Sequence, residues 1–218
     1  DAGYLILKQG GNAVDAAVAV GFALAVTLPR AGNLGGGGFM LIYSADSQEV
    51  SAIDYRSAAP VAATSEMFLT ESGVVRFGHL VNAVPGSVAG LLKAHKKYGK
   101  LGLKEVLKPA IELASTGFPV PHDLNFVLDW AKGSMLDNNA SRKKFYNSKD
   151  QPLPTASNFK QPKLARTLSL IANEGSKVFY EGEIADWIVE DSIANGGLIT
   201  KQDLASYSAK DRLPIESF

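Results

Sequence analysis

The spacing of apolar and polar residues predicts a chain in which helices dominate and strands form one early hairpin. Residues 13–27 run almost without charge, and small side chains all round this stretch predict a helix that is buried on most sides. Residues 39–43 and 50–55 are apolar, β-branched or aromatic and are separated by a short polar segment. That arrangement is typical of a β-hairpin.

Turn and capping residues set the expected boundaries of the other helices. Gly10 and Gly11 end a first helix over residues 4–9, and Asn12 followed by Asp15 predicts a capped start for the helix at residue 13. Further helices are expected over residues 87–98, 103–115 (with a kink or break at Pro109), 123–132, 162–174 and 182–195, and a short one from the cap Thr200 through Tyr207. Residues 138–159 are expected to form a loop.

The fold class expected from this inventory is α+β, with residues 1–218 as a single incomplete domain. Hydrophobic residues make up 46% of the chain, which is enough for a sizeable core. A lone two-stranded hairpin is marginal in water, so the rest of the sheet is expected to lie outside this sequence. Both ends look cut, because the chain opens at Asp1 in an already helical pattern, without an initiator Met or a signal peptide.

Composition excludes several functional classes. The 22 basic and 22 acidic residues cancel, so the long-range positive field that nucleic-acid binding exploits is missing. The absence of cysteine excludes disulfides, thiolate metal sites and a cysteine nucleophile in this segment. The longest apolar stretch, residues 16–28, is well short of the roughly 20 residues of a membrane helix, so no membrane span is expected.

The histidines and lysines give no sign of a site. His79, His95 and His122 are scattered, and none has a second ligand at a metal spacing, so neither a metal nor another cofactor is expected. The lysines between residues 93 and 108 are interrupted by Gly99 and Gly102, which favours a solvated surface over a binding face.

A glycine run carries more information about chemistry. Residues 35–38 are four consecutive glycines, which can take positive φ or let another backbone or a ligand come close. The run follows a helix and precedes a strand, and Phe39 stands where a phosphate loop needs Lys, so both nucleotide-binding interpretations fail. Gly86-Ser87 lacks the intervening residue of a nucleophile elbow and instead predicts the start of a helix.

Arg56 is the candidate binding residue. It follows the second strand of the hairpin, so its guanidinium could point from a rigid strand end into a cleft and bind a carboxylate through two parallel hydrogen bonds. The alternative is a structural ion pair with Asp54 or another acid, which is the commoner use of such an arginine.

Seven blocks in order along the chain resemble the large subunit of γ-glutamyltranspeptidases. Together they extend over nearly the whole chain and are far more specific than a single motif. They are residues 10–19 (GGNAVDAAVA), 32–40 (GNLGGGGFM), 54–56 (DYR), 84–90 (VPGSVAG), 97–99 (KYG), 179–182 (FYEG) and 196–200 (GGLIT).

The resemblance implies an N-terminal-nucleophile hydrolase with an αββα sandwich, made as a precursor that cuts itself into large and small subunits. A threonine at the new N-terminus of the small subunit would attack the γ-glutamyl amide of glutathione or a similar compound, and water or an amino acid would resolve the acyl-enzyme. By its motif, Arg56 matches the arginine that holds the α-carboxylate. The resemblance also implies a periplasmic or secreted enzyme, or a surface one in animals.

Two departures and two alternatives accompany this resemblance. Ser57 follows the arginine where family members often have an acid, and the chain ends at Phe218, before the family's cleavage point. No catalytic residue is therefore expected in this segment, which alone should be inactive without its small subunit. The alternatives are a related glutaryl, cephalosporin or poly-γ-glutamate acylase, and a non-catalytic domain that binds a small acid.

Overall fold

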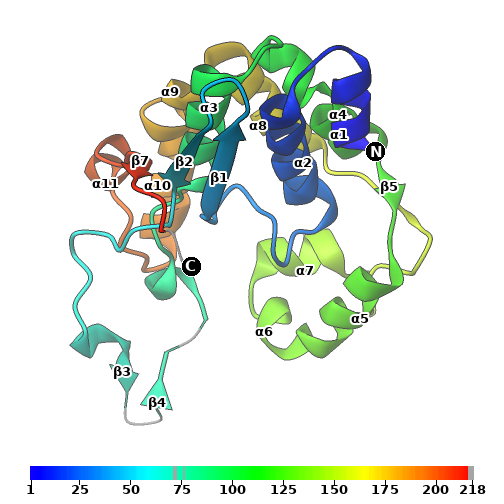
Figure 1. The fold of residues 1–218 in the computed structure, drawn as a ribbon. Coiled ribbons are helices and arrows are strands. Elements are labelled where there is room, and N and C mark those ends of the chain that lie inside the picture. The colour runs from blue at the N-terminus through cyan, green and yellow to red at the C-terminus, as the bar shows by residue number, and fades with distance from the viewer. Residues whose placement is uncertain (71–72, 76, 216–218) are drawn as a thin grey trace.

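Helices cover one side of a small antiparallel sheet in the computed structural model of the chain, which describes residues 1–70, 73–75 and 77–215 (Figure 1). The helix α3 packs against the strands β1 and β2. The helices are α1 (Ala2–Lys8), α2 (Ala13–Thr27), α3 (Ser87–Tyr98), α4 (Leu103–Thr116), α5 (His122–Trp130), α6 (Lys132–Leu136), α7 (Asn139–Phe145), α8 (Pro162–Glu174), α9 (Ser176–Tyr180), α10 (Glu183–Ala194) and α11 (Lys201–Ala205). The α+β class is as the sequence predicts.

The main sheet has the strand order β1–β2–β7 and is antiparallel throughout. The predicted hairpin is confirmed as β1 (Phe39–Ser44) and β2 (Glu49–Asp54), with Phe39 opposite Asp54. The third strand, β7 (Lys210–Arg212), was not predicted from the sequence. Two-residue strand pairs complete the inventory: β3 (Leu69–Thr70) with β4 (Gly73–Val74), and β5 (Phe118–Pro119) with β6 (Asn158–Phe159).

The core is centred on α2, which packs against α1, α3 and α4, while α4 also packs against α8. Val18, Phe22 and Val26 of α2 are fully buried, as are Leu107 of α4 and Leu168 of α8. Burying a side chain of this size stabilises the fold by about 1.5 to 3 kcal/mol. Through α3, these closely packed helices support the main sheet and the residues at its strand ends.

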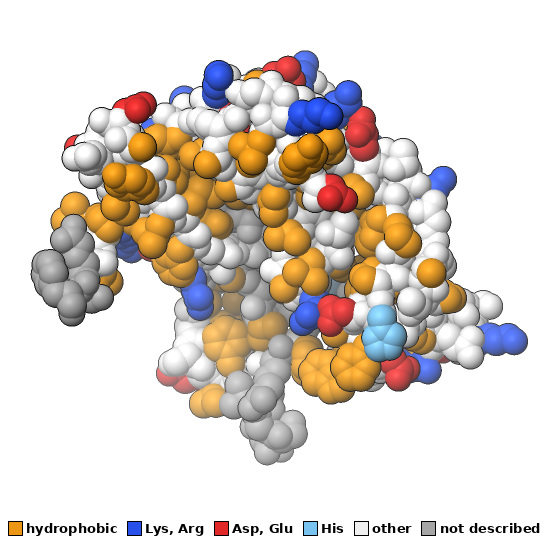
Figure 2. Space-filling view, turned by 45° about the vertical axis from the view of Figure 1, so that its right-hand side comes forward, with side chains coloured by type: hydrophobic (Ala, Val, Ile, Leu, Met, Phe, Trp, Pro, Cys, Tyr) orange, Lys and Arg blue, Asp and Glu red, His pale blue; other side chains and the backbone are white. Residues whose placement is uncertain are grey.

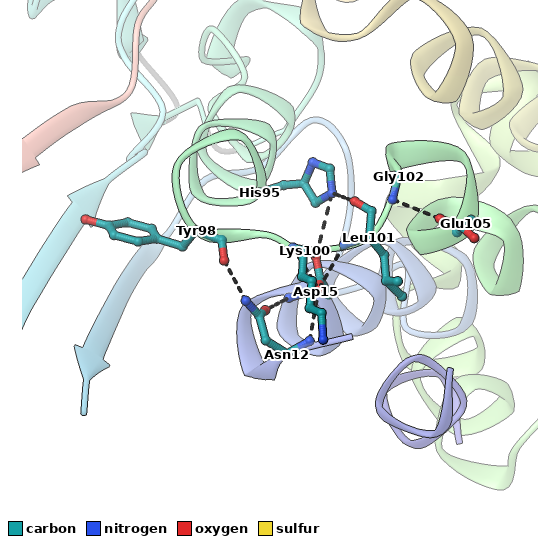
Figure 3. Close-up of polar contacts among 8 residues, drawn as sticks. All are labelled: Asn12, Asp15, His95, Tyr98, Lys100, Leu101, Gly102 and Glu105. Atoms are coloured by element: carbon teal, nitrogen blue, oxygen red, sulfur yellow. Dashed lines mark hydrogen bonds and ion pairs between the residues drawn. The ribbon is translucent and has the colours of Figure 1, made fainter. Parts of the chain in front are cut away.

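A buried carboxylate fastens the start of α2 to the turn between α3 and α4 (Figure 3). Asp15 is fully buried and accepts hydrogen bonds from the backbone N–H groups of Asn12 (2.9 Å), Lys100 (3.0 Å) and Leu101 (3.3 Å). The Asn12 side chain accepts in turn from the Asp15 N–H (2.9 Å) and donates to the Tyr98 carbonyl (2.6 Å). The predicted helix cap is therefore confirmed, and it also serves as a tertiary fastener.

Several predicted boundaries need correction. Of the kink or break expected at Pro109, the break is wrong: helix α4 runs unbroken through this residue, because tertiary packing outweighs the hydrogen bond that a proline removes. The predicted loop over residues 138–159 contains α7, whose first turn is capped when the Asn138 side chain accepts from the Ser141 N–H (2.9 Å). Short α9 was also missed, since it lies between two longer helices and ends in the aromatic pair Phe179–Tyr180.

Both edge strands of the main sheet, β1 and β7, pair only with β2 in the described part of the chain, and one face of the sheet is left uncovered. Strand β1 pairs only with β2, and its outward residues Phe39, Leu41 and Tyr43 are 65%, 71% and 63% exposed. A groove of about 430 Å³ lies between β1 and the start of α2, lined by Ala13 and Ala17 among others. Figure 2 shows hydrophobic side chains spread over one face of the molecule. Long exposed apolar edge strands are rare in native proteins, because their unpaired backbone groups promote pairing with another strand.

Candidate functional site

Arg56 lies just beyond the end of β2 and is exposed. The ladder extends one pair past the strand, because the Tyr55 N–H donates to the Gly38 carbonyl (2.9 Å) and the Gly38 N–H donates to the Tyr55 carbonyl (3.2 Å). Arg56 lines a cleft of about 430 Å³ together with residues of the C-terminal segment. The other lining residues are Asp54, Ser57, Ala58, Ala59, Val61, Val84, Asp203, Ser206, Tyr207, Ser208, Lys210 and Arg212.

The backbone of Arg56 is held on both sides. Its N–H donates to Asp54 Oδ1 (3.0 Å), and its carbonyl accepts from the hydroxyl of Tyr207 (2.9 Å). The neighbouring Ala58 exchanges backbone hydrogen bonds with Val84. The peptide units around the arginine are therefore held by the nearby Asp54 and by two distant parts of the chain, at Val84 and Tyr207.

The structural ion pair between Arg56 and Asp54 that the sequence left open does not form. The second oxygen of Asp54 accepts instead from Arg212 of β7, at 3.1 Å from Nε and 3.0 Å from Nη2. The Arg56 N–H and then the Arg212 guanidinium hold the pKa of Asp54 below its ordinary value, against a partial desolvation that opposes ionisation. Within the described ranges the Arg56 side chain forms no ion pair, so its donors remain available to an anion.

Tyr207 is itself held in place by an aromatic neighbour. Its ring stacks on that of Tyr180, with centroids 5.7 Å apart and planes 11° from parallel. The Tyr180 hydroxyl donates to the Pro85 carbonyl (2.8 Å) and accepts from the Ala89 N–H (3.1 Å), which ties it to the start of α3. Burial raises the pKa of both phenols, so each stays protonated and able to donate at neutral pH.

Glycines surround the segment that carries Arg56. The sequence suggested two reasons for the glycine run, positive φ and close approach, and the first of these does not apply. None of the four glycines at 35–38 has positive φ. A Cβ at Gly37 would lie 2.5 Å from the Ser57 nitrogen, and one at Gly86 or Gly90 would overlap Tyr55. The Gly36 carbonyl also accepts from the N–H groups of Gly86 (2.8 Å) and Ser87 (2.9 Å). Within the run, Gly37 permits close approach of the backbone at Tyr55 to Ser57, and Gly38 permits close approach of the Tyr55 ring. Close approach is the second possibility that the sequence offered.

An acidic residue on α11 also lines the cleft. Asp203 is buried and accepts from the Val61 N–H (2.8 Å) and from both the N–H (2.9 Å) and the hydroxyl (2.6 Å) of Thr200. Burial alone would raise its pKa, but these hydrogen bonds outweigh burial and hold the pKa below its ordinary value. Both carboxylates of the cleft are thus already engaged, whereas Arg56 is not.

Of the three histidines considered from the sequence, His79 and His95 contact other parts of the chain and His122 does not line the cleft. His79 lies 2.8 Å from Asp191, and His95 contacts the Leu101 carbonyl (2.9 Å), while His122 is exposed at the start of α5. Among the described residues no group of three or more His, Asp or Glu could hold a metal ion. In the same ranges no helix has both the length and the apolar character to cross a bilayer.

Two of the lysines between residues 93 and 108, Lys93 and Lys97, contact the segment of β7 from α3. Lys93 donates to the Ala209 carbonyl (2.8 Å) and pairs with Asp211 (2.7 Å), which Lys97 also approaches (3.5 Å). Sequence analysis did not single out Tyr207, Asp211 or Arg212, because their partners lie far away in the chain and no local motif links them. The segment over residues 207–212 is therefore the part of the site that only the structure reveals.

Comparison with known proteins places the chain in a family. The family model described as gamma-glutamyltranspeptidase matches residues 1–217. The glutathione hydrolase proenzyme of Escherichia coli K12 is 47% identical over 98% of this chain, which spans 37% of that relative's length. The crystal structure of Helicobacter pylori gamma-glutamyltranspeptidase is 43% identical, with a TM-score of 0.94 over 98% of this chain and 62% of its own.

A more distant structure is that of cephalosporin acylase from Bacillus halodurans, which is 30% identical, with a TM-score of 0.86 over 98% of this chain and 41% of its own. The chain is thus similar to enzymes named for two different acyl groups, yet the family model matches it almost from end to end. The family resemblance seen in the sequence is confirmed: the chain belongs to the γ-glutamyltranspeptidase family.

Proposed function

We propose that the protein containing this chain hydrolyses or transfers the γ-glutamyl group of glutathione and related γ-glutamyl amides, with Arg56 binding the α-carboxylate. The observation that carries this proposal is the state of Arg56. It stands at the end of a rigid strand, lines a cleft, and forms no ion pair among the described residues, although two acids line the same cleft.

The chemistry suits an amino-acid carboxylate. A guanidinium presents two parallel N–H donors that match a carboxylate, and hydrogen bonds to charged groups contribute about 1.5 to 3 kcal/mol each. Fixing the α-carboxylate also fixes the direction of the rest of the γ-glutamyl group. The distant γ-carbonyl is then aligned for attack, which lowers the entropy cost of reaction.

The nucleophile in this proposal belongs to a small subunit cut from the same precursor. Its N-terminal threonine hydroxyl would form an ester with the γ-carbonyl carbon as the bond from that carbon to the amide nitrogen breaks, and the leaving amine would take up a proton. Water or an acceptor amine would then release the glutamyl group. Residues 1–218 supply binding but no catalytic group and are expected to be inactive alone.

The open edge of β1 is where we place that partner. A further strand paired with β1 would satisfy its free backbone groups beside the groove lined by Ala13 and Ala17, and the body of the partner would cover the sheet face that carries Leu41. In this arrangement, residues 1–218 form one incomplete domain that the small subunit finishes. We also propose that the mature protein is periplasmic or secreted, which fractionation of the native host would test.

The main rival is an acylase with another preferred acyl group, favoured by the similarity to the Bacillus halodurans cephalosporin acylase. The full-length protein should be assayed with a γ-glutamyl anilide and with the matching glutaryl anilide, which lacks only the α-amino group. We expect the γ-glutamyl compound to be the much better substrate. A preference for the glutaryl compound would replace our proposal with the acylase.

The other rival is a non-catalytic domain that uses Arg56 to bind a small acid. Mass spectrometry of the purified full-length protein separates the two, because a self-processing enzyme yields two chains, the second beginning with threonine. A single uncut chain that binds glutamate but turns over neither anilide would favour the binding domain.

Arg56→Lys tests the role of the arginine itself, because lysine keeps the charge and loses the paired donors. We expect KM for the γ-glutamyl anilide to rise by roughly 10-fold to 100-fold, while self-cleavage of the precursor continues. Unchanged kinetics would remove Arg56 from the site.

A further inference from the structure

One short C-terminal segment, residues 207–212, supplies two of the side chains that hold the peptide units around Arg56, one directly and one through Asp54. Tyr207 donates to the Arg56 carbonyl at 2.9 Å. Arg212 binds the carboxylate of Asp54, whose other oxygen accepts from the Arg56 N–H at 3.0 Å. We propose that Tyr207 and the Asp54–Arg212 pair are positioning residues that hold Arg56 for the substrate carboxylate; this inference rests on the proposed function.

The hydroxyl of Tyr207 is placed with little freedom. Its ring stacks on Tyr180, and the Tyr180 hydroxyl is fixed by one hydrogen bond given to Pro85 and one received from Ala89. A Cβ at Gly86 would overlap the Tyr207 hydroxyl oxygen. Gly86 therefore leaves room for the Tyr207 hydroxyl. Through its hydrogen bond to Arg56 and its stacking on Tyr180, Tyr207 links the end of β2 to the start of α3.

Strand β7 supplies the second constraint on the Arg56 peptide, through Arg212 and Asp54. In the β2–β7 register, Ala52 lies opposite Arg212 and Asp54 opposite Lys210. This register brings the Arg212 guanidinium to Asp54. The Asp211 carboxylate, on the residue between them, is anchored to α3 by Lys93 at 2.7 Å. Strand β7 is thus fastened to the body of the molecule while it holds the acid that orients Arg56.

Backbone position matters because the arginine side chain is long. A small rotation of the Arg56 peptide is amplified at the guanidinium, and a misplacement of about 1 Å can cost as much as 100-fold in rate. Ser57 provides no charge to steady the guanidinium from the chain itself. Orientation must then come from the fixed backbone, which Tyr207 and Asp54 secure from opposite sides.

The test is a double-mutant cycle in the full-length, self-processed protein, with a γ-glutamyl anilide as substrate. Tyr207→Phe removes the hydroxyl and keeps the ring stacked. We expect KM to rise by about 3-fold to 10-fold with kcat within about twofold, because one neutral hydrogen bond is lost. In an Arg56→Ala background the same substitution should change kcat/KM by less than about twofold.

A matched control exists in Tyr146→Phe. The Tyr146 hydroxyl also donates to a backbone carbonyl, that of Leu128, but in the α5–α7 region away from the cleft. This variant should leave KM unchanged. If it raised KM as Tyr207→Phe does, or if Tyr207→Phe acted equally with and without Arg56, the effect would be general loss of structure and the positioning role would be overturned.

Failure of this inference and failure of the proposed function give different results. If Arg56→Ala raises KM and Tyr207→Phe does not, Arg56 binds substrate without this support. If neither variant changes KM, the proposed role of Arg56 fails. Should Tyr207→Phe not mature, Arg212→Gln replaces it, because this side chain is half exposed; a KM unchanged in that variant would also overturn the inference, and a rise of about 2-fold to 5-fold would support it.

Discussion

Gly90 of α3 lies directly against the ring of Tyr55, so that a Cβ at position 90 would overlap the first carbon of the ring. Tyr55 in turn precedes Arg56, and its ring packs against the core. The helix therefore approaches the strand end closely only because position 90 has no side chain. The position of the candidate binding residue depends on this contact between a helix and a strand.

Gly90→Ala should destabilise the protein although alanine is the better helix former. Overlap with Tyr55 forces the helix or the strand end to move, at a cost of roughly 1 to 3 kcal/mol. The measurement is the midpoint of thermal unfolding, together with KM for the γ-glutamyl anilide, which should rise. Gly133→Ala in α6 is the control: a Cβ there meets nothing within 4 Å, so a gain of a few tenths to about 1 kcal/mol is expected. Equal stability for both variants would contradict the close contact.

Asp15→Ala tests the buried fastener at the start of α2. Removing the carboxylate leaves the N–H groups of Asn12, Lys100 and Leu101 without their acceptor, at an expected cost of about 3 kcal/mol or more. For a domain of this size the midpoint of thermal unfolding should fall by roughly 6 to 12 °C. Asp123→Ala removes an exposed ion pair with Arg30 instead and should cost less than about 1 kcal/mol. A similar loss in both would show that Asp15 does not fasten the turn.

Much of the fold could be predicted from local signals. The hairpin, the helix at 13–27 and the helix starts at Asn12, Gly86 and Thr200 all follow from patterns a few residues long, and the structure confirms each. Helix α7 was missed because a polar surface resembles a loop, although Asn138 carried a capping signal that could have revealed it.

The site was only partly predictable for a physical reason. The position of Arg56 follows from its motif, but its partners depend on chain segments that meet only in the folded state. Tyr207 contacts the Arg56 carbonyl across 151 positions of sequence, and Arg212 reaches Asp54 across 158. The glycine run showed the same limit: close approach was foreseen, whereas the identity of the approaching backbone, at Tyr55 to Ser57, was not.

Leu41→Lys should prevent stable association with the small subunit. Leu41 is exposed on β1, whose outer edge is unpaired among the described residues, and a lysine at an edge position discourages pairing with a further strand. The expected result is a lower yield of the mature two-chain complex by size-exclusion chromatography. Ile193→Lys changes a similarly exposed side chain on α10 and should leave that yield unaltered. Normal assembly of the Leu41 variant would show that the partner binds elsewhere.

Acid should remove the stabilising effect of Asp203. The folded state holds the pKa of Asp203 below its ordinary value of 3.8. The group therefore stabilises the fold above that pH, and its effect is lost as the pH falls through the lower folded pKa. Asp203→Asn should be less stable than the parent protein near neutral pH, and the difference in thermal midpoint should narrow as the pH falls below about 4. A difference that stayed constant, or widened, would contradict the direction of the shift.

The most direct test of the central claim compares two substrates that differ only in the α-carboxylate. The parent protein and Arg56→Ala are each given a γ-glutamyl anilide and the matching 4-aminobutyryl anilide, and kcat/KM is measured for all four pairs. We expect the parent protein to favour the γ-glutamyl compound by roughly 10-fold or more and the variant to lose most of that preference. A preference that survives intact without Arg56 would contradict the claim that this arginine binds the substrate carboxylate.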